Sequence, residues 1–203
     1  MKAILINGST HENGCTYTAL SEVANQLARH DIESEIVHIG NNAVHGCTAC
    51  AQCKTLGRCI FNDLCNDIIG KMASAQALVI GSPVYFAAPN GALCAVLDRL
   101  FYAGGKVLTG KVGAAVVSCR RGGASAAFDR LNKYFSILQM PIATSQYWNS
   151  VHGNMPSEVM QDLEGLQTMR TLADNIAWLL QNLKAGNVAR SQNETPVKTN
   201  FCK

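Results

Sequence analysis

The chain has 203 residues, a formal net charge of +3 and 15% charged residues, which is below the usual quarter. This length allows one domain with a sizeable core. The small and scattered positive charge, without interleaved aromatic residues, excludes a nucleic-acid-binding surface.

The chain begins with a short apolar run, Ala3–Ile6, which is typical of a strand buried on both faces of a parallel sheet. A loop over residues 7–16 follows, and then a helical pattern with Leu20, Val23 and Leu27 on one face. A strand, a small-residue loop and a helix in this order present backbone amides and a helix N-terminus to an anion.

The first loop lacks the lysine of a Walker loop, and its glycines do not have the dinucleotide spacing. It offers the hydroxyls of Ser9, Thr10 and Thr16, together with His11 when that side chain is protonated. Such a neutral cradle suits a terminal monophosphate. An ordinary, well-capped connection between strand and helix is the alternative interpretation.

Four more strands are expected, at residues 35–39, 77–81, 112–118 and 142–145. Helices are expected from an N-cap at Asp63, and over about 89–101, 124–138 and 156–184. Residues 185–203 are polar and are expected to form a C-terminal tail. No apolar run approaches a membrane span and no signal-peptide pattern is present, so we expect a cytoplasmic protein.

Five apolar strands separated by helices predict an α/β fold, with a doubly wound parallel sheet of order 2-1-3-4-5 and helices on both faces. The order reverses between strands one and three, so the loops that follow these strands form the expected ligand crevice. Residues 9–16, 82–86 and 120–123 then lie in one cleft. A phosphate loop beside an aromatic ledge would fit a flat heterocycle with a phosphate tail, and FMN is the obvious candidate.

The chain resembles the NADPH-dependent FMN reductase and flavodoxin-like family, and within it most closely the iron–sulfur flavoprotein branch. The resemblance covers about residues 2–180 and rests on Gly8-Ser9, Asn13-Gly14-Cys15-Thr16, Gly81-Ser82-Pro83-Val84-Tyr85-Phe86, Leu97-Asp98-Arg99 and Arg121-Gly122-Gly123. It implies a flavodoxin-like FMN-binding domain over residues 1–184, which includes the cysteine-rich loop 46–59.

The resemblance also implies site residues. The FMN phosphate would be held by Ser9, Thr10, His11, Gly14, Cys15 and Thr16. The ring and its ribityl chain would be bordered by Pro83, Val84, Tyr85 and Phe86, and the ring edge by Arg120, Arg121, Gly122 and Gly123. The chain departs from the family pattern where His11 replaces an arginine and Cys15 an asparagine.

Nine cysteines in a reducing compartment favour metal, cluster or redox chemistry over disulfides. Cys47, Cys50, Cys53 and Cys59 form a C-x2-C-x2-C-x5-C run, which suits a cuboidal iron–sulfur cluster better than the paired knuckles of zinc sites. The resemblance implies a [4Fe-4S] cluster here, and free thiols that merely pack are the alternative. Cys65, Cys94 and Cys119 are expected as buried small hydrophobes. A redox-active thiol is the alternative for Cys119, because it ends a strand at the expected crevice.

These features favour an FMN-dependent oxidoreductase that takes electrons from NAD(P)H and passes them to a small electron-poor acceptor. No side chain is nominated as catalytic, because the flavin carries the chemistry. The alternatives are an electron carrier that receives single electrons from ferredoxin through the cluster, and a non-enzymatic thiol or metal-sensing module. A homodimer or homotetramer is expected, without a nucleic-acid or membrane partner.

Overall fold

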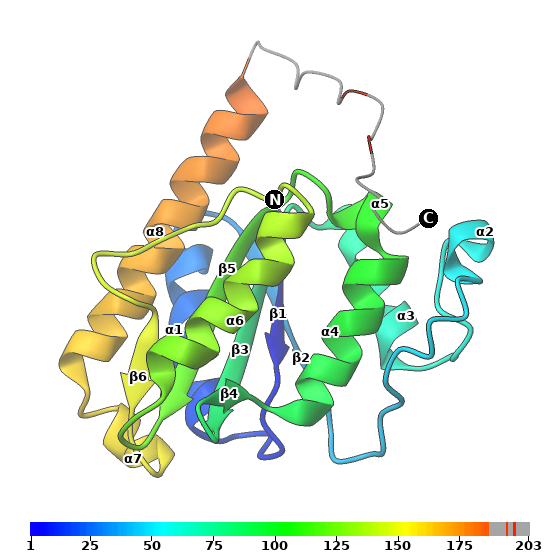
Figure 1. Cartoon of the computed structure of the whole chain (residues 1–203). Coiled ribbons are helices and arrows are strands. Elements are labelled where there is room, and N and C mark those ends of the chain that lie inside the picture. Colours follow the sequence, from blue (N-terminus) through cyan, green and yellow to red (C-terminus); the bar gives the residue numbers. More distant parts are fainter. Residues whose placement is uncertain (187–193, 195–196, 198–203) are drawn as a thin grey trace.

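The computed structural model describes residues 1–186, 194 and 197, so the expected tail over 185–203 lies mostly outside the described residues. A sheet of five parallel strands forms the centre of the molecule (Figure 1), in the order β2-β1-β3-β5-β6. These strands are β1 (Lys2–Asn7), β2 (Glu33–His38), β3 (Ala77–Tyr85), β5 (Val112–Cys119) and β6 (Ser150–His152). The doubly wound fold expected from the sequence is confirmed.

Helices cover both faces of this sheet (Figure 1). One face carries α1 (Cys15–Ala28) and α8 (Leu163–Ala185), and the other carries α3 (Leu64–Ser74), α4 (Gly91–Ala103) and α6 (Ala124–Ile137). The shorter helices are α2 (Cys53–Leu56), α5 (Gly105–Leu108) and α7 (Pro156–Val159). As expected, Asp63 caps α3, because its side chain accepts a hydrogen bond from the Cys65 amide. Among the described residues, no helix combines the length and the apolar character that a membrane span needs.

Strand β1 contributes to both layers of the core. Ile4 and Ile6 pack under α3 and α4, whereas Ala3 and Leu5 pack under α1 and α8, and all four are fully buried. This double burial explains the unbroken apolar run, because neither face of the strand meets water. The carboxyl end of β1 is therefore held on both sides, which fixes the position of the loop that follows.

The last strand does not lie where the sequence predicted it. Residues 142–145 make only an isolated bridge between Gly113 and Ile142, and β6 is instead Ser150–His152. This short strand contains a single apolar residue, Val151, so its composition gives no strand signal. Its pairing with β5 decides its place, since Val117 lies opposite Ser150. The prediction at 142–145 was wrong for that reason.

The expected helix over residues 156–184 is two helices, α7 and α8, separated by a turn. Asp162 starts the second helix, because its Oδ1 accepts a hydrogen bond from the Gly165 amide at 2.9 Å. Its Oδ2 accepts from the His152 amide at 2.7 Å and thus ties the turn to β6. The Asp162 carboxylate therefore caps α8 and also anchors β6. It can do both because the chain leaves the helical conformation between α7 and α8.

A third difference lies at the end of β3, which continues to Tyr85 instead of ending at residue 81. It turns back through Phe86 and Ala87 into a two-residue strand, β4 (Ala88–Pro89), that pairs with it antiparallel. Both turn residues have positive φ, 51° and 59°, although neither is glycine. The sequence therefore carried no glycine or asparagine signal for this hairpin.

Candidate functional site

Three loops meet at the carboxyl edge of the sheet. The Gly8 amide donates to Gly81 O at 2.9 Å, which joins the loop after β1 to β3. Thr16 Oγ1 and Ser118 Oγ lie 2.8 Å apart and join α1 to β5. A Cβ on Gly123 would lie 2.9 Å from Ala87 Cα, so the loop after β5 contacts the β3–β4 hairpin. The structure thus brings together the three segments that the sequence placed in one crevice.

The loop after β1 is held by side chains at its base. Asn7 Oδ1 accepts from the Ser9 amide at 3.2 Å, and Asn7 Nδ2 donates to Glu12 O at 2.9 Å. His38 Nε2, at the end of β2, donates to Ser9 O at 2.8 Å. Ser9 Oγ accepts from the His11 amide at 3.0 Å. Neither Asn7 nor His38 was singled out from the sequence, although both stand at strand ends beside the expected crevice.

Helix α1 opens toward this loop without a side-chain cap. Gly14 is its N-cap residue and makes no side-chain hydrogen bond, and the first turn contains no acidic residue. By contrast, Asp63, Asn90 and Asp162 cap α3, α4 and α8 with side-chain oxygens. No side-chain oxygen therefore caps the positive end of α1, at the edge where a phosphate is expected, and the residues present fit such a group.

Besides Ser9, two of the expected phosphate residues have protein partners for their side chains. The Cys15 thiol lies 3.6 Å from Gly153 O, and burial raises its pKa, so the side chain remains a protonated donor. The Thr16 hydroxyl pairs with Ser118. Ser9 and Thr16 are buried, Thr10, Gly14 and Cys15 are half-buried, and His11 is exposed. The contribution of Cys15 and Thr16 to an anion site would come from their backbone amides.

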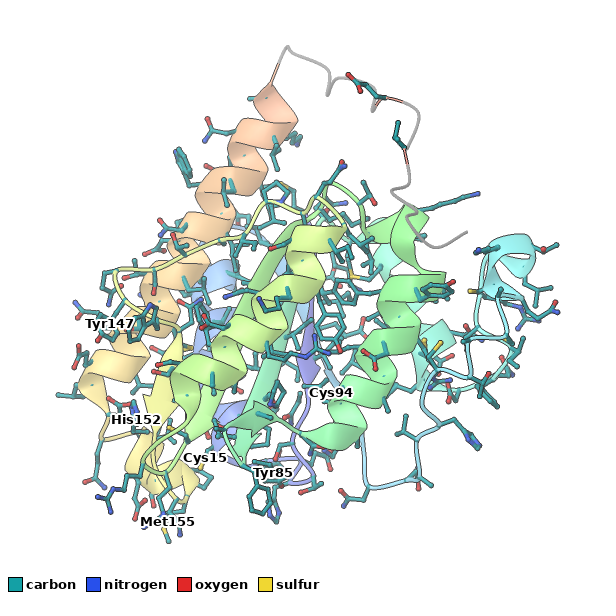
Figure 2. All side chains as sticks on the ribbon, viewed as in Figure 1. Cys15, Tyr85, Cys94, Tyr147, His152 and Met155 are labelled. Atoms are coloured by element: carbon teal, nitrogen blue, oxygen red, sulfur yellow. The ribbon has the colours of Figure 1, made fainter. Side chains whose placement is uncertain are left out.

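The hairpin supplies exposed aromatic surface at the same edge. Tyr85 is 43% exposed and Phe86 is fully exposed at the tip, while Pro83 and Val84 are half-buried beneath them. Figure 2 shows Tyr85, Cys15 and His152 along the edge where β1, β3 and β6 end. Beside the hairpin, the loop after β5 exposes Arg120, Arg121 and Gly122, with Gly123 half-buried. An apolar hairpin and a basic loop are thus neighbours at the carboxyl edge of the sheet.

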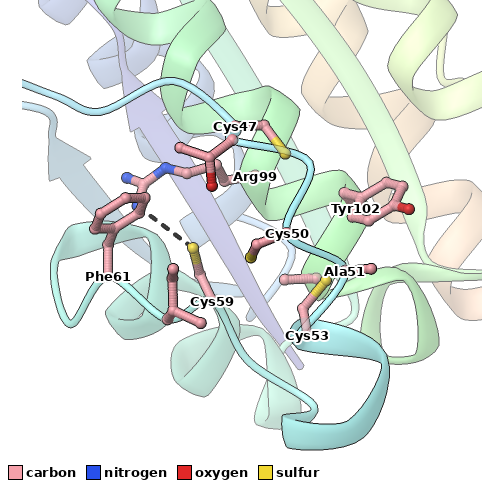
Figure 3. Close-up of a pocket in the computed structure, with 11 residues that line it drawn as sticks. Cys47, Cys50, Ala51, Cys53, Cys59, Phe61, Arg99 and Tyr102 are labelled. Atoms are coloured by element: carbon pink, nitrogen blue, oxygen red, sulfur yellow. Dashed lines mark hydrogen bonds between the residues drawn. The ribbon is translucent and has the colours of Figure 1, made fainter.

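The four cysteines of the run lie apart from this edge, beside α4, and line one pocket (Figure 3). The pocket has a volume of about 330 Å³, which includes its open mouth, and it is also lined by Phe61, Arg99 and Tyr102. Cys47 and Cys50 are exposed, Cys53 is half-buried and Cys59 is buried. The thiols therefore stand at increasing depth around a shared space.

Within the described part of the chain, no group of His, Cys, Asp or Glu is gathered closely enough for one metal ion. A single zinc needs its thiolates at about 2.3 Å from one point. In a cuboidal cluster each thiolate binds a different iron, so its ligands surround a larger volume. Four thiols spread around one pocket fit the second arrangement better than the first.

The backbone of the cysteine loop is itself unusual. Ala49 and Ala51, on either side of Cys50, have φ of 53° and 57°, and neither is glycine. Each such residue costs about 1–2 kcal/mol. Ala51 is followed by Gln52 in the right-handed helical region. Alternation of left- and right-handed residues turns successive amides toward one side, which is a backbone arrangement found at anion and iron–sulfur sites.

Asn66 fixes the buried end of the loop. Its Oδ1 accepts from the Cys59 amide at 2.9 Å, and its Nδ2 donates to Cys59 O and Phe61 O, each at 3.0 Å. These three hydrogen bonds of Asn66 hold the backbone of Cys59 against α3. They do not depend on whether the other three thiols bind a cluster. Asn66 could not be singled out from the sequence, because an asparagine inside a helix belongs to no motif.

Of the three cysteines expected as buried small hydrophobes, Cys65 and Cys119 are buried and Cys94 is only half-buried. Cys65 is fully buried, and burial raises the pKa of its thiol to about 12. Burial also raises the pKa of Cys94 and of Cys119. These three side chains remain protonated thiols at neutral pH, which suits packing better than redox chemistry.

The family model for NADPH-dependent FMN reductase matches residues 1–154. An iron–sulfur flavoprotein of Methanocaldococcus jannaschii is 31% identical over 192 residues, covering 91% of this chain and 100% of that protein. An iron–sulfur flavoprotein of Methanosarcina thermophila is 26% identical, covering 89% and 96%.

Solved structures with the same fold include a flavodoxin from the domain Archaea, with a TM-score of 0.61 and 16% identity, covering 89% of this chain and 99% of that one. The apo form of an NADH:FMN oxidoreductase has a TM-score of 0.63 and 18% identity, covering 88% and 89%.

Proposed function

Because the chain belongs to the NADPH-dependent FMN reductase family, on its iron–sulfur flavoprotein branch, we propose that it is an FMN-dependent oxidoreductase. Its electrons would come from a reduced nicotinamide, and a small electron-poor organic molecule would accept them. The observation that carries the proposal is the α1 N-terminus, capped only by Gly14, at an edge that also exposes Tyr85 and Phe86.

The residues of this edge would divide the work of binding. Amides and hydroxyls of the loop after β1 would hold the phosphate, from Ser9, Thr10, His11, Gly14, Cys15 and Thr16. The segment Pro83–Phe86 would border the ring, and residues 120–123 would lie at its edge, where a guanidinium stabilises negative charge. When bound, FMN supplies two-electron exchange with a nicotinamide and one-electron exchange with a carrier. The protein supplies position and charge.

The cysteine pocket supports a second candidate function. We propose that Cys47, Cys50, Cys53 and Cys59 hold a [4Fe-4S] cluster, through which single electrons from a carrier such as ferredoxin would enter the protein. The supporting observation is that all four thiols of the run line one pocket with a buried guanidinium. A thiol or metal-sensing module without flavin is the competing outcome.

Anaerobic purification and reconstitution would test both candidates. The visible spectrum, released FMN, iron and acid-labile sulfide are measured together, and oxidation of NADH and NADPH is followed with a quinone as acceptor. Cys50→Ser should remove iron and sulfide and leave FMN in place, because Cys50 is exposed and away from the crevice. The matched control Cys65→Ala should retain all three. Protein that binds zinc but neither FMN nor iron would overturn the proposal.

A further inference from the structure

Arg99 is the most deeply buried cation beside the cysteine pocket. Its side chain on α4 is 1% exposed, and Nη2 lies 2.7 Å from Asp63 Oδ2. Nη1 lies 3.6 Å from Cys59 Sγ. Nε is buried without a hydrogen-bond partner among the described residues. A buried guanidinium is costly unless its charge and donors are matched, and one partly exposed carboxylate matches only part of them.

A cation–π contact with Phe61 helps to hold this guanidinium. Its central carbon lies 5.5 Å from the centre of the Phe61 ring, and Phe61 is itself stacked on His45 with 4.5 Å between ring centres. Phe61 also lines the pocket (Figure 3). Its carbonyl oxygen accepts a hydrogen bond from Asn66 Nδ2. Arg99 is therefore not a flexible surface cation that lies near the thiols by chance. It is a clamped donor in the wall of the pocket.

We propose that Arg99 sets the reduction potential of the cluster site by offering a buried positive charge and N–H donors to its sulfurs. This inference rests on the proposed cluster at Cys47, Cys50, Cys53 and Cys59. Reduction adds one electron, and hence one negative charge, without making or breaking a bond to the protein. A buried cation stabilises the more negative state more strongly than the less negative one, and water screens it little.

The test compares Arg99→Gln and Arg99→Lys with Arg58→Gln in anaerobically reconstituted protein. Arg58 precedes Cys59 but is exposed, so its removal changes the net charge equally and leaves the buried donors in place. Cluster potentials are measured by dithionite titration with electron paramagnetic resonance, after iron and sulfide contents have been matched. The potential of the bound FMN serves as an internal reference.

We expect Arg99→Gln to lower the equilibrium constant for one-electron reduction at least tenfold, which is about 59 mV. Arg99→Lys keeps the charge and loses the planar fork, so it should lie between Gln and the parent, at least threefold below the parent. Arg58→Gln should stay within twofold. If Arg99→Gln does not assemble a cluster, the Lys variant decides the question by the same criterion.

Two results would overturn the inference, and they differ. Parent protein that binds FMN but no iron or sulfide would remove the cluster itself. If Arg99 variants that contain the cluster have the parental cluster potential, the proposed cluster stands. Arg99 would then be only a structural partner of Asp63. A purely structural role would change thermal stability and leave the potential unmoved.

Discussion

Replacement of Gly123 by alanine tests the meeting of the loops at the crevice. Gly123 has φ of +88°, and an added Cβ would lie 2.9 Å from Ala87 Cα and 3.0 Å from Val84 Cγ1. Two of these three residues belong to the β3–β4 hairpin, and Ala87 is itself in a left-handed conformation. The substitution therefore combines backbone strain with a clash against backbone that is already strained.

The expected magnitude follows from these two effects. A left-handed alanine costs about 1–2 kcal/mol and overpacking costs about 1–3 kcal/mol, so we expect a loss of about 2–5 kcal/mol in the free energy of unfolding. For a chain of this length each kcal/mol moves the Tm by about 2–4 °C, so the midpoint should fall by about 4–20 °C. If the hairpin moves aside instead, the same energy appears as weaker FMN binding, at about tenfold for each 1.4 kcal/mol.

The neighbouring glycine provides the control. Gly122 has no heavy atom within 4 Å of an added Cβ and no positive φ in the left-handed region, so Gly122→Ala should change neither property. Thermal unfolding by circular dichroism and FMN titration by quenching of flavin fluorescence report both outcomes. Two variants with the same Tm and the same FMN affinity would refute the contact between the loop after β5 and the hairpin.

Two further substitutions address the base of the site and the acid stability of the fold. His38→Phe removes the donor to Ser9 O. Because a hydrogen bond contributes about 0.5–1.5 kcal/mol net, FMN should bind about twofold to tenfold more weakly, whereas riboflavin, which lacks the phosphate, should bind unchanged in the same titration. The hydrogen bond from Lys71 lowers the pKa of Glu35 below 4.5, and Lys2 adds to the effect. This pair therefore stabilises the protein above about pH 4.5 and stops doing so as the pH falls through the lowered pKa. Glu35→Gln should flatten the pH dependence of the Tm in that range at low salt, and an unchanged profile would contradict the pairing.

The sequence predicted those parts of the fold whose signal is continuous along the chain. The buried strands β1, β3 and β5 each contain an unbroken apolar run, and the long helices repeat their apolar residues with helical spacing. Strand β6 has one apolar residue, and the β3–β4 hairpin turns through Phe86 and Ala87, so neither leaves a local pattern. The positions of β6 and of the hairpin depend on pairing with a neighbouring strand. The periodicity of a single sequence carries no information on such pairing.

The candidate site shows the same division. The sequence predicted that three loops meet, because the topology of a doubly wound sheet requires it. It also singled out the four cysteines by their spacing. It missed Asn66 and His38, which donate to backbone carbonyls of neighbouring loops, and it did not connect Arg99 with Asp63 and Cys59. Such contacts depend on side chains from separate elements and leave no spacing to recognise.

The four sulfurs of the cysteine run lie at different depths, and their exposure to solvent sets the order in which oxidants reach them. Dioxygen and peroxide arriving from solvent reach the exposed Cys47 and Cys50 first, while Cys59 lies buried under the clamp of Asn66. Oxidative damage therefore begins at the outer rim, where small thiol reductants can also reverse its early stages. From this order of depth we expect Cys59, the buried sulfur, to be oxidised last.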